Sequence, residues 1–297
     1  MDLKPKAEAN KISKMLNLVL GNDRFPVDIE KLALEYSQQT SPNDRISKVK
    51  SEVFEGIEGA LVRHPSGTKW KILYNENIKS DGRRRFTIAH EFGHYILHRA
   101  EMNEFLCSSI AGEKSSAPKD VENEADTFAS YLLMPLDDFR KQLTDQKFSI
   151  ELLIHCASRY GVSLMAAALK LKEIIPKRIV VVAARDGMLL WAAPNEKAYK
   201  SGAYIKTKGV PPVSLPENSL MSSLSPNTLS DIKTQPARIW FPNEPEGLTL
   251  IEHVFIATEG YDYTLGVLEL ENFDGYSNSD KEDSLLNPLN GRLQLSR

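Results

Sequence analysis

The sequence predicts an α+β protein in which a helix-rich part with one small sheet is followed by a part rich in strands. Apolar residues recur every three or four positions in several segments of residues 3–175, which is the spacing of amphipathic helices. Residues 45–74 break this pattern with short apolar runs between glycines, and after Pro176 the apolar runs become β-like and alternate with proline-rich loops. The 297 residues have the length of about two average domains.

The first 75 residues predict two helices and a small antiparallel sheet. One helix covers about residues 3–20, and Pro26 opens a second, short helix. The apolar runs of residues 45–74 predict the strands, and Pro65-Ser66-Gly67 predicts the loop of a hairpin.

Helical spacing then continues as far as Pro176, with a stretch rich in Ser, Gly, Ala and Glu, residues 100–118, expected to be a loop. The expected helices cover about residues 82–99, 119–134, 136–145, 149–160 and 163–175. We therefore expect a core domain in residues 1–135, whose sheet packs on the first of these helices, and a helical annex of helix–turn–helix type in residues 136–176.

Residues 177–297 predict a C-terminal domain that is α/β or mainly β. Strands are expected over residues 178–184, 188–193, 238–241, 250–258 and 263–270. Residues 209–236 hold five prolines and many Ser and Asn, so we expect mostly loop there. The polar stretch from Asn272 onward is expected to fray.

Composition narrows the class of protein. The 37 basic and 40 acidic side chains give a net charge of −3, which argues against a protein that binds nucleic acid electrostatically. The two cysteines form no C-x-x-C motif, as suits a reducing compartment. No apolar stretch of signal-peptide type opens the chain, and its longest apolar run, residues 179–184, is too short to cross a membrane. We therefore expect a cytoplasmic protein that does not enter a membrane.

The motif with chemical content is His90-Glu91-Phe92-Gly93-His94, an H-E-x-x-H pattern. On a helix, residues four apart share a face, so the imidazoles of His90 and His94 can converge on one metal ion. Glu91 is rotated by about 100° from His90, so its carboxylate can reach a water on the metal without being a ligand itself. The pattern therefore predicts a metal site with a general base beside it.

A third ligand is expected from the next helix. His98 lies about 12 Å along the axis from His90, too far to share an ion held by bonds of about 2.0–2.1 Å, so we expect it to support a ligand, face the substrate or pack. Glu122 and Asp126 share a helix face. Glu122 is the candidate ligand, and Asp126 can hydrogen-bond a ligating histidine. Glu124 points about 200° away and is expected to face solvent.

Two separated motifs resemble the ImmA/IrrE family of zinc metallo-endopeptidases. They are residues 85–98, which contain H-E-x-x-H, and residues 122–135, which open with Glu-Asn-Glu-Ala-Asp and end with Leu-Leu-Met-Pro. The resemblance covers about residues 10–175. It implies a zincin-like core of gluzincin type, in which His90, His94 and Glu122 bind one Zn²⁺ per chain and Glu91 activates the water. Mn²⁺ is an alternative metal, because it accepts the same ligands.

The resemblance also implies a substrate. Members of this family characteristically cleave a helix-turn-helix transcriptional repressor, which derepresses a mobile element or stress-response genes. The expected partner is thus a protein substrate, with no direct contact to nucleic acid. Some relatives carry a C-terminal sensor-like domain similar to GAF domains, so residues 177–297 are expected to act in sensing or recognition.

Several alternatives stay open. A regulatory protein could keep the metal site and act only by binding its partner, although the presence of Glu91 favours catalysis. A DNA-binding regulator could use residues 149–172, but the second of those helices is apolar where a reading helix needs polar side chains. Tyr95, His98 or an arginine could assist zinc in stabilising an oxyanion. Cys107 and Cys156 are expected to be small apolar or surface residues.

Overall fold

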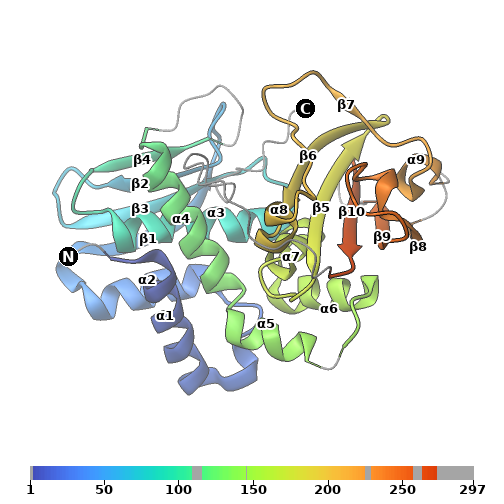
Figure 1. Ribbon diagram of the computed structural model, residues 1–297. Coiled ribbons are helices and arrows are strands. Elements are labelled where there is room, and N and C mark those ends of the chain that lie inside the picture. Colours follow the sequence, from blue (N-terminus) through green and yellow to red (C-terminus); the bar gives the residue numbers. More distant parts are fainter. Residues whose placement is uncertain (1–2, 109–115, 145, 225–228, 257–262, 273–297) are drawn as a thin grey trace. The chain divides into compact units, whose positions relative to one another are not determined.

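The computed structural model describes residues 3–108, 116–144, 146–224, 229–256 and 263–272 (Figure 1). These residues form two compact units. The first lies within Met1–Thr144 and His155–Ser163, and the second within Asp145–Ile154 and Leu164–Gly291. Each unit combines helices with a sheet, which confirms the predicted α+β class. The division at residues 135 and 176 stays a prediction.

The first unit holds the N-terminal helices and the smaller sheet. Its elements are α1 (Pro5–Leu20), η1 (Gly21–Arg24), α2 (Ile29–Thr40), η2 (Pro42–Asp44), β1 (Arg45–Glu52), β2 (Gly59–Arg63), β3 (Lys69–Asn75), α3 (Asp81–Leu97), β4 (Glu104–Cys107), α4 (Lys119–Leu133) and α5 (Leu136–Leu143). Helix α6 (Ile150–Tyr160) contributes residues to both units.

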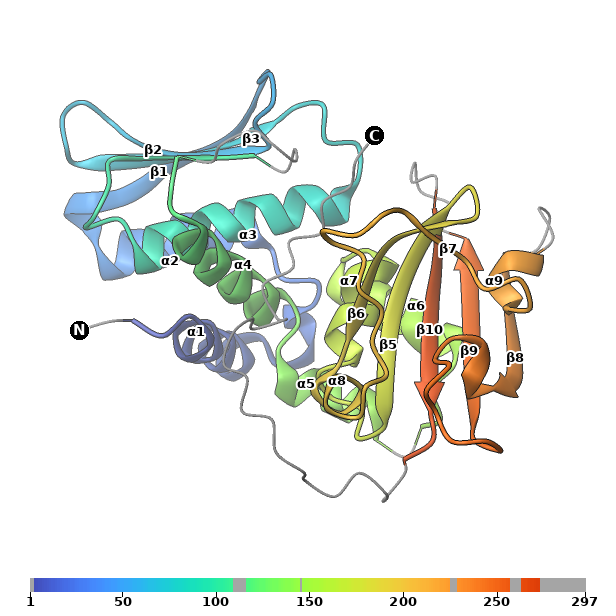
Figure 2. The same ribbon diagram turned by 45° about the horizontal axis from the view of Figure 1, so that its top comes forward.

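The four-stranded sheet, of order β1-β3-β2-β4, lies over α3 (Figure 2). Alternate residues of β3 point to the same face, and Trp70 and Ile72 on that face are fully buried. They belong to one apolar cluster with Phe92 and Tyr95 of α3. Helix α3 also contacts α4, so it has packed neighbours on more than one side and is buried from Thr87 to Ile96.

The sheet is mixed, so the prediction of a purely antiparallel sheet is wrong. Strands β2 and β3 form the predicted antiparallel hairpin around Pro65-Ser66-Gly67, and β4 pairs antiparallel with β2. Strand β1, however, pairs parallel with β3, with Val49 opposite Ile72. Strand β3 lies between β1 and β2 in the sheet, although β2 follows β1 in the sequence. The apolar spacing within each segment does not indicate this order of strands.

Strand β4 falls inside residues 100–118, which the sequence predicted to be a loop. It has four residues, Glu104–Cys107, of which Phe105 and Cys107 are buried. Strands this short carry too few alternating positions to stand out from loop sequence. Its pairing with β2 places it at one edge of the sheet.

The second unit is built on a larger antiparallel sheet of order β7-β6-β5-β10-β9-β8. Its elements are α7 (Leu164–Leu171), β5 (Arg178–Arg185), β6 (Met188–Pro194), α8 (Glu196–Lys200), β7 (Val213–Ser214), α9 (Leu220–Ser223), β8 (Ser230–Pro236), η3 (Ala237–Ile239), β9 (Thr249–Ile256) and β10 (Thr264–Leu270). Strands β5 and β10 occupy the middle and are almost wholly buried.

One predicted strand of this unit lies in the wrong place. Residues 238–241 were expected to be a strand, but Ala237–Ile239 form a 3-10 turn, and the edge strand β8 precedes them at Ser230–Pro236. Most side chains of β8 are exposed, so its sequence lacks the apolar alternation by which a strand is recognised. The predicted fraying after Asn272 lies outside the described residues.

Among the described residues no single helix has both the length and the apolar character needed to cross a bilayer. Helices α6 and α7 have the required length and apolar character only when they are counted as one segment, and the chain bends by 109° between them.

Candidate metal centre

Helix α3 carries the H-E-x-x-H motif in its buried middle. It begins after Ser80, whose hydroxyl accepts a hydrogen bond from the Arg83 amide at 3.4 Å and so caps the first turn. One turn separates His90 from His94, and their Nε2 atoms lie 3.0 Å apart. The structure thus brings both predicted ligands together by their distal ring nitrogens.

Gly93 lets the next helix approach this pair closely. A Cβ at position 93 would lie 3.1 Å from Cδ1 of Phe128 and 3.2 Å from the carbonyl oxygen of Ala125, both on α4. Any larger residue would push α4 away. With glycine in place, Glu122 reaches the histidines, its Oε2 3.5 Å from Nε2 of His90 and its Oε1 3.7 Å from Nε2 of His94.

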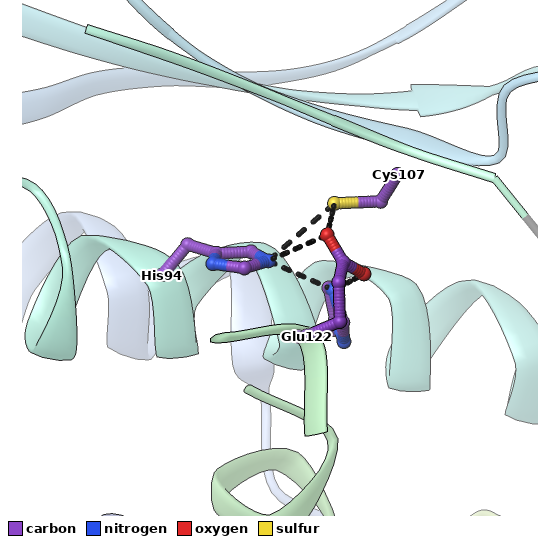
Figure 3. A group of neighbouring side chains, drawn as sticks. His94, Cys107 and Glu122 are labelled. Carbon is purple, nitrogen blue, oxygen red and sulfur yellow. Dashed lines mark hydrogen bonds and ion pairs between the residues drawn. The ribbon is translucent and has the colours of Figure 1, made fainter. Parts of the chain in front are cut away.

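A fourth group, which the sequence did not predict for the site, comes from the sheet. Cys107 at the end of β4 points down toward α3 and α4 (Figure 3). Its Sγ lies 3.5 Å from Nε2 of His94 and 3.7 Å from Oε1 of Glu122. Cys107 is buried, but it also contacts two other residues of the site. This corrects the prediction that it is only a small apolar or surface residue. The only signal in the sequence is its spacing of two from Phe105.

Asp126 supports His90 from behind, as predicted for it. Its Oδ1 lies 2.8 Å from Nδ1 of His90, so the ring presents Nε2 to the other ligands. Burial alone would lower the pKa of His90, but the hydrogen bond and charge of Asp126, with the hydrogen bond of Glu122, outweigh it and raise the pKa to about 10. A metal ion at this position must therefore displace a proton.

His98 and Glu124 support His94 in the same way. Nδ1 of His98 lies 3.1 Å from Nδ1 of His94, and its Nε2 lies 2.9 Å from Oε2 of Glu124. Glu124 is exposed, as predicted, with 49% of its side chain accessible. Its carboxylate also contacts His98, which is buried and needs an acceptor.

Glu91 lies beside this group without joining it. The residue is fully buried, and neither carboxylate oxygen has a hydrogen-bond partner in the described part of the chain. Burial raises the pKa of Glu91 to about 8, against the lowering effects of His90 and the Cys107 thiol. Buried carboxyl oxygens without a partner among the described residues commonly contact a bound water, ion or substrate.

The donor set fits a metal ion. One ligand atom each from His90, His94, Cys107 and Glu122 all lie within 4.8 Å of one another. Two imidazoles, a carboxylate and a thiol are the ligand types of a tetrahedral transition-metal site, above all zinc. The orphaned carboxylate of Glu91 fits a water held at such an ion.

Two candidates for oxyanion stabilisation are engaged elsewhere. The Tyr95 hydroxyl donates to the carbonyl oxygen of Asp44 at 2.9 Å. Both ring nitrogens of His98 are used by His94 and Glu124. Each side chain therefore already has its hydrogen bonds within the fold.

Comparison with known proteins points to a family. Residues 47–172 match the model of the IrrE N-terminal-like domain, a metallopeptidase family. A stretch of 83 residues is 34% identical to the metallopeptidase ImmA of Bacillus subtilis (strain 168), covering 27% of this chain and 43% of that protein. The chain thus spans less than half the length of this curated relative.

Proposed function

Through residues 47–172 the chain belongs to the ImmA/IrrE family of metallopeptidases, and from this premise we propose that it is a zinc-dependent endopeptidase. The observation that carries the proposal is the position of Glu91. Its buried, unpartnered carboxylate lies next to the cluster of His90, His94 and Glu122, where a general base for water is required.

Zinc is the metal we propose. Histidine nitrogens and a carboxylate oxygen are the protein ligands of zinc peptidases of the His₂Glu type. In the structure His90 and His94 are held by Asp126 and His98, as zinc-bound histidines usually are held by a second hydrogen bond. Manganese binding is the alternative outcome.

The residues of the chain divide the work of hydrolysis. Bound zinc would polarise the scissile carbonyl and lower the pKa of water toward about 7. Glu91 accepts a proton from the attacking water and delivers it to the departing amine nitrogen. Asp126 and His98 hold the rings of His90 and His94 in the orientation that presents Nε2.

We further propose that the substrate is a helix-turn-helix transcriptional repressor. The support is the family, whose members characteristically act on such proteins, together with the net charge of −3, which favours a protein partner over direct DNA binding. A role in recognition or sensing for residues 177–297 is part of the same proposal.

The test compares the full chain with Glu91→Gln and with Glu101→Gln, a matched change at an exposed glutamate outside the cluster. Each protein is loaded with zinc, its metal content is measured, and it is incubated with purified helix-turn-helix regulators encoded near its gene. We expect about one zinc per chain in all three, and cleavage that falls at least about 100-fold in Glu91→Gln alone.

Two results would count against this function. Equal cleavage by the wild type and Glu91→Gln would remove the base from the mechanism. Binding of a regulator without any cleavage, under full zinc occupancy and in Cys107→Ala as well as in the wild type, would favour the alternative of a regulatory protein that acts through binding.

A further inference from the structure

We propose that the thiolate of Cys107 is a fourth ligand of the metal in the resting protein and fills the position that the hydrolytic water needs. The inference rests on the proposed function, because it requires a metal among His90, His94 and Glu122. It adds that the site is closed until Cys107 leaves the metal.

The distances carry this inference. In a tetrahedral zinc site with bonds of about 2.0–2.1 Å to N or O and about 2.3 Å to S, two ligand atoms lie about 3.3–3.6 Å apart. Sγ of Cys107 lies 3.5 Å from Nε2 of His94 and 3.7 Å from Oε1 of Glu122. The sulfur thus lies at about the distance of a fellow ligand from two of the other three groups, and one ligand atom from each of the four residues lies within 4.8 Å of the others.

The fold holds the sulfur in this place. Cys107 pairs with Gly59 across β4 and β2, so its backbone is fixed in the sheet. Phe105, two residues earlier on the same face of the strand, stacks on the ring of His94 with centroids 4.5 Å apart and an interplanar angle of 19°. Strand β4 is therefore anchored directly above the second histidine of the motif, and Sγ points into the cluster (Figure 3).

A fourth protein ligand changes what the site can do. Structural zinc sites have four protein ligands, whereas catalytic sites keep one position open for water or substrate. With Cys107 bound, the carboxylate of Glu91 has no water on the metal to deprotonate. Peptide hydrolysis then requires that Sγ is first displaced, so the resting enzyme is latent.

Cobalt reports the ligand directly. The full chain is loaded with Co²⁺ in place of zinc, because cobalt accepts the same ligands and a thiolate bound to it gives a charge-transfer band in the near ultraviolet. We expect this band in the wild type and in Cys156→Ala, and its loss in Cys107→Ala. Cys156 is the matched control, since it is the other cysteine and is buried in α6 outside the cluster.

Alkylation of the unaltered protein gives a second readout that does not depend on a variant folding. Zinc should slow the reaction of iodoacetamide with Cys107 at least about tenfold, and a chelator should restore the rate, as measured by mass spectrometry of the modified peptide.

The Cys107→Ala variant gives a third readout. It should bind zinc at least about tenfold more weakly and, at saturating zinc, cleave substrate faster than the wild type.

The outcomes separate this inference from the proposed function. Cobalt bound in a form that requires His90 and His94, but without a thiolate band and without protection of Cys107, overturns the fourth ligand and leaves the peptidase proposal standing. Failure of the wild type to bind cobalt or zinc at all overturns both.

Discussion

His94 and His98 are joined through their Nδ1 atoms at 3.1 Å, and the far side of His98 reaches Glu124 at 2.9 Å. If His94 holds a metal through Nε2, its Nδ1–H donates to His98, whose Nε2–H donates to the carboxylate. His90 needs no such intermediate, since Asp126 contacts its Nδ1 at 2.8 Å. Helix α4 therefore supports both histidines, one directly and one through a relay.

Breaking the relay at its outer end is expected to weaken metal binding. Glu124→Ala removes the acceptor for His98, so the orientation of His94 is less well defined, and we expect about a tenfold rise in the zinc dissociation constant. Competition with a chromophoric chelator measures it. Glu101→Ala, also a change at an exposed glutamate, should leave the constant unaltered.

Asp126→Ala is expected to act more strongly. This carboxylate contacts a predicted ligand directly, and loss of such a partner typically costs 10- to 100-fold in metal affinity, so we expect a rise of about 10- to 100-fold here. Asp120→Ala on the same helix, at an exposed position, is the control. Equal zinc constants for the two variants would show that the contact with His90 has no role in binding.

Local spacing predicted the part of the site that lies on two helices. His90 and His94 are four residues apart, and so are Glu122 and Asp126, and a helix converts this spacing into a shared face whatever it packs against. The structure brings Glu122 and Asp126 to the histidines as the pattern indicated. The contact of Glu124 with His98 was missed, because a long side chain can turn back from the flank of its helix.

The spacing of apolar residues within one segment could not predict which distant segment it pairs with in a sheet. Cys107 enters the site only because β4 pairs with β2, with Cys107 opposite Gly59, and four residues give no periodic signal. The parallel alignment of β1 with β3 and the exposed strand β8 were missed for the same reason. In each case the partner strand, and not the segment's own sequence, determines the structure.

Gly59 is expected to be intolerant of a side chain. A Cβ there would lie 2.6 Å from Oε1 of Glu91 and 2.6 Å from Cγ2 of Thr87, well inside contact distance. Gly59→Ala should lower the free energy of unfolding by about 1–3 kcal/mol and displace the Glu91 carboxylate. Urea denaturation measures the first effect, and cleavage rate the second.

A double variant tests the cause of this loss. Thr87→Ser removes Cγ2 and thus one of the two clashes, so Gly59→Ala combined with Thr87→Ser should be more stable than the sum of the single changes indicates. Strict additivity would mean that the alanine acts on the strand itself and not on α3.

Glu252 is expected to be the polar centre of the second unit. It is fully buried, and its carboxylate accepts from the amides of Leu220 and Met221 at 3.1 and 2.8 Å, from Nε1 of Trp240 at 2.9 Å, and from the side chain of Gln235. Glu252→Ala leaves these buried donors without an acceptor. At about 1–3 kcal/mol for each unsatisfied group, the free energy of unfolding of the second unit should fall by several kcal/mol. Tryptophan fluorescence during urea denaturation measures this loss of stability. Glu246→Ala, at a side chain 91% exposed, should change stability by less than about 0.5 kcal/mol.

Asp138 is expected to make the first unit sensitive to acid. Burial tends to raise the pKa of its carboxyl, but the hydrogen bonds from Arg159 at 2.8 Å and from Tyr160 at 2.8 Å, with the charge of Arg24, lower it below the ordinary value. A carboxyl whose pKa is lower in the folded than in the unfolded chain stabilises the fold above the unfolded pKa of about 3.9. This stabilisation is lost as the pH falls through the lower, folded value.

Asp138→Asn should therefore reduce the free energy of unfolding by about 1–3 kcal/mol at pH 7, because the charge that pairs with Arg159 is gone. The difference from the wild type should shrink as the pH falls below about 3.9, because Asp138 then takes up its proton in the unfolded chain while the folded carboxyl stays charged down to its lower pKa. Asp137→Asn alters a neighbouring side chain that is 58% exposed and should show neither effect. A gap between wild type and Asp138→Asn that stays constant from pH 7 to pH 3 would assign the loss to packing, since a lost charge must disappear with the proton.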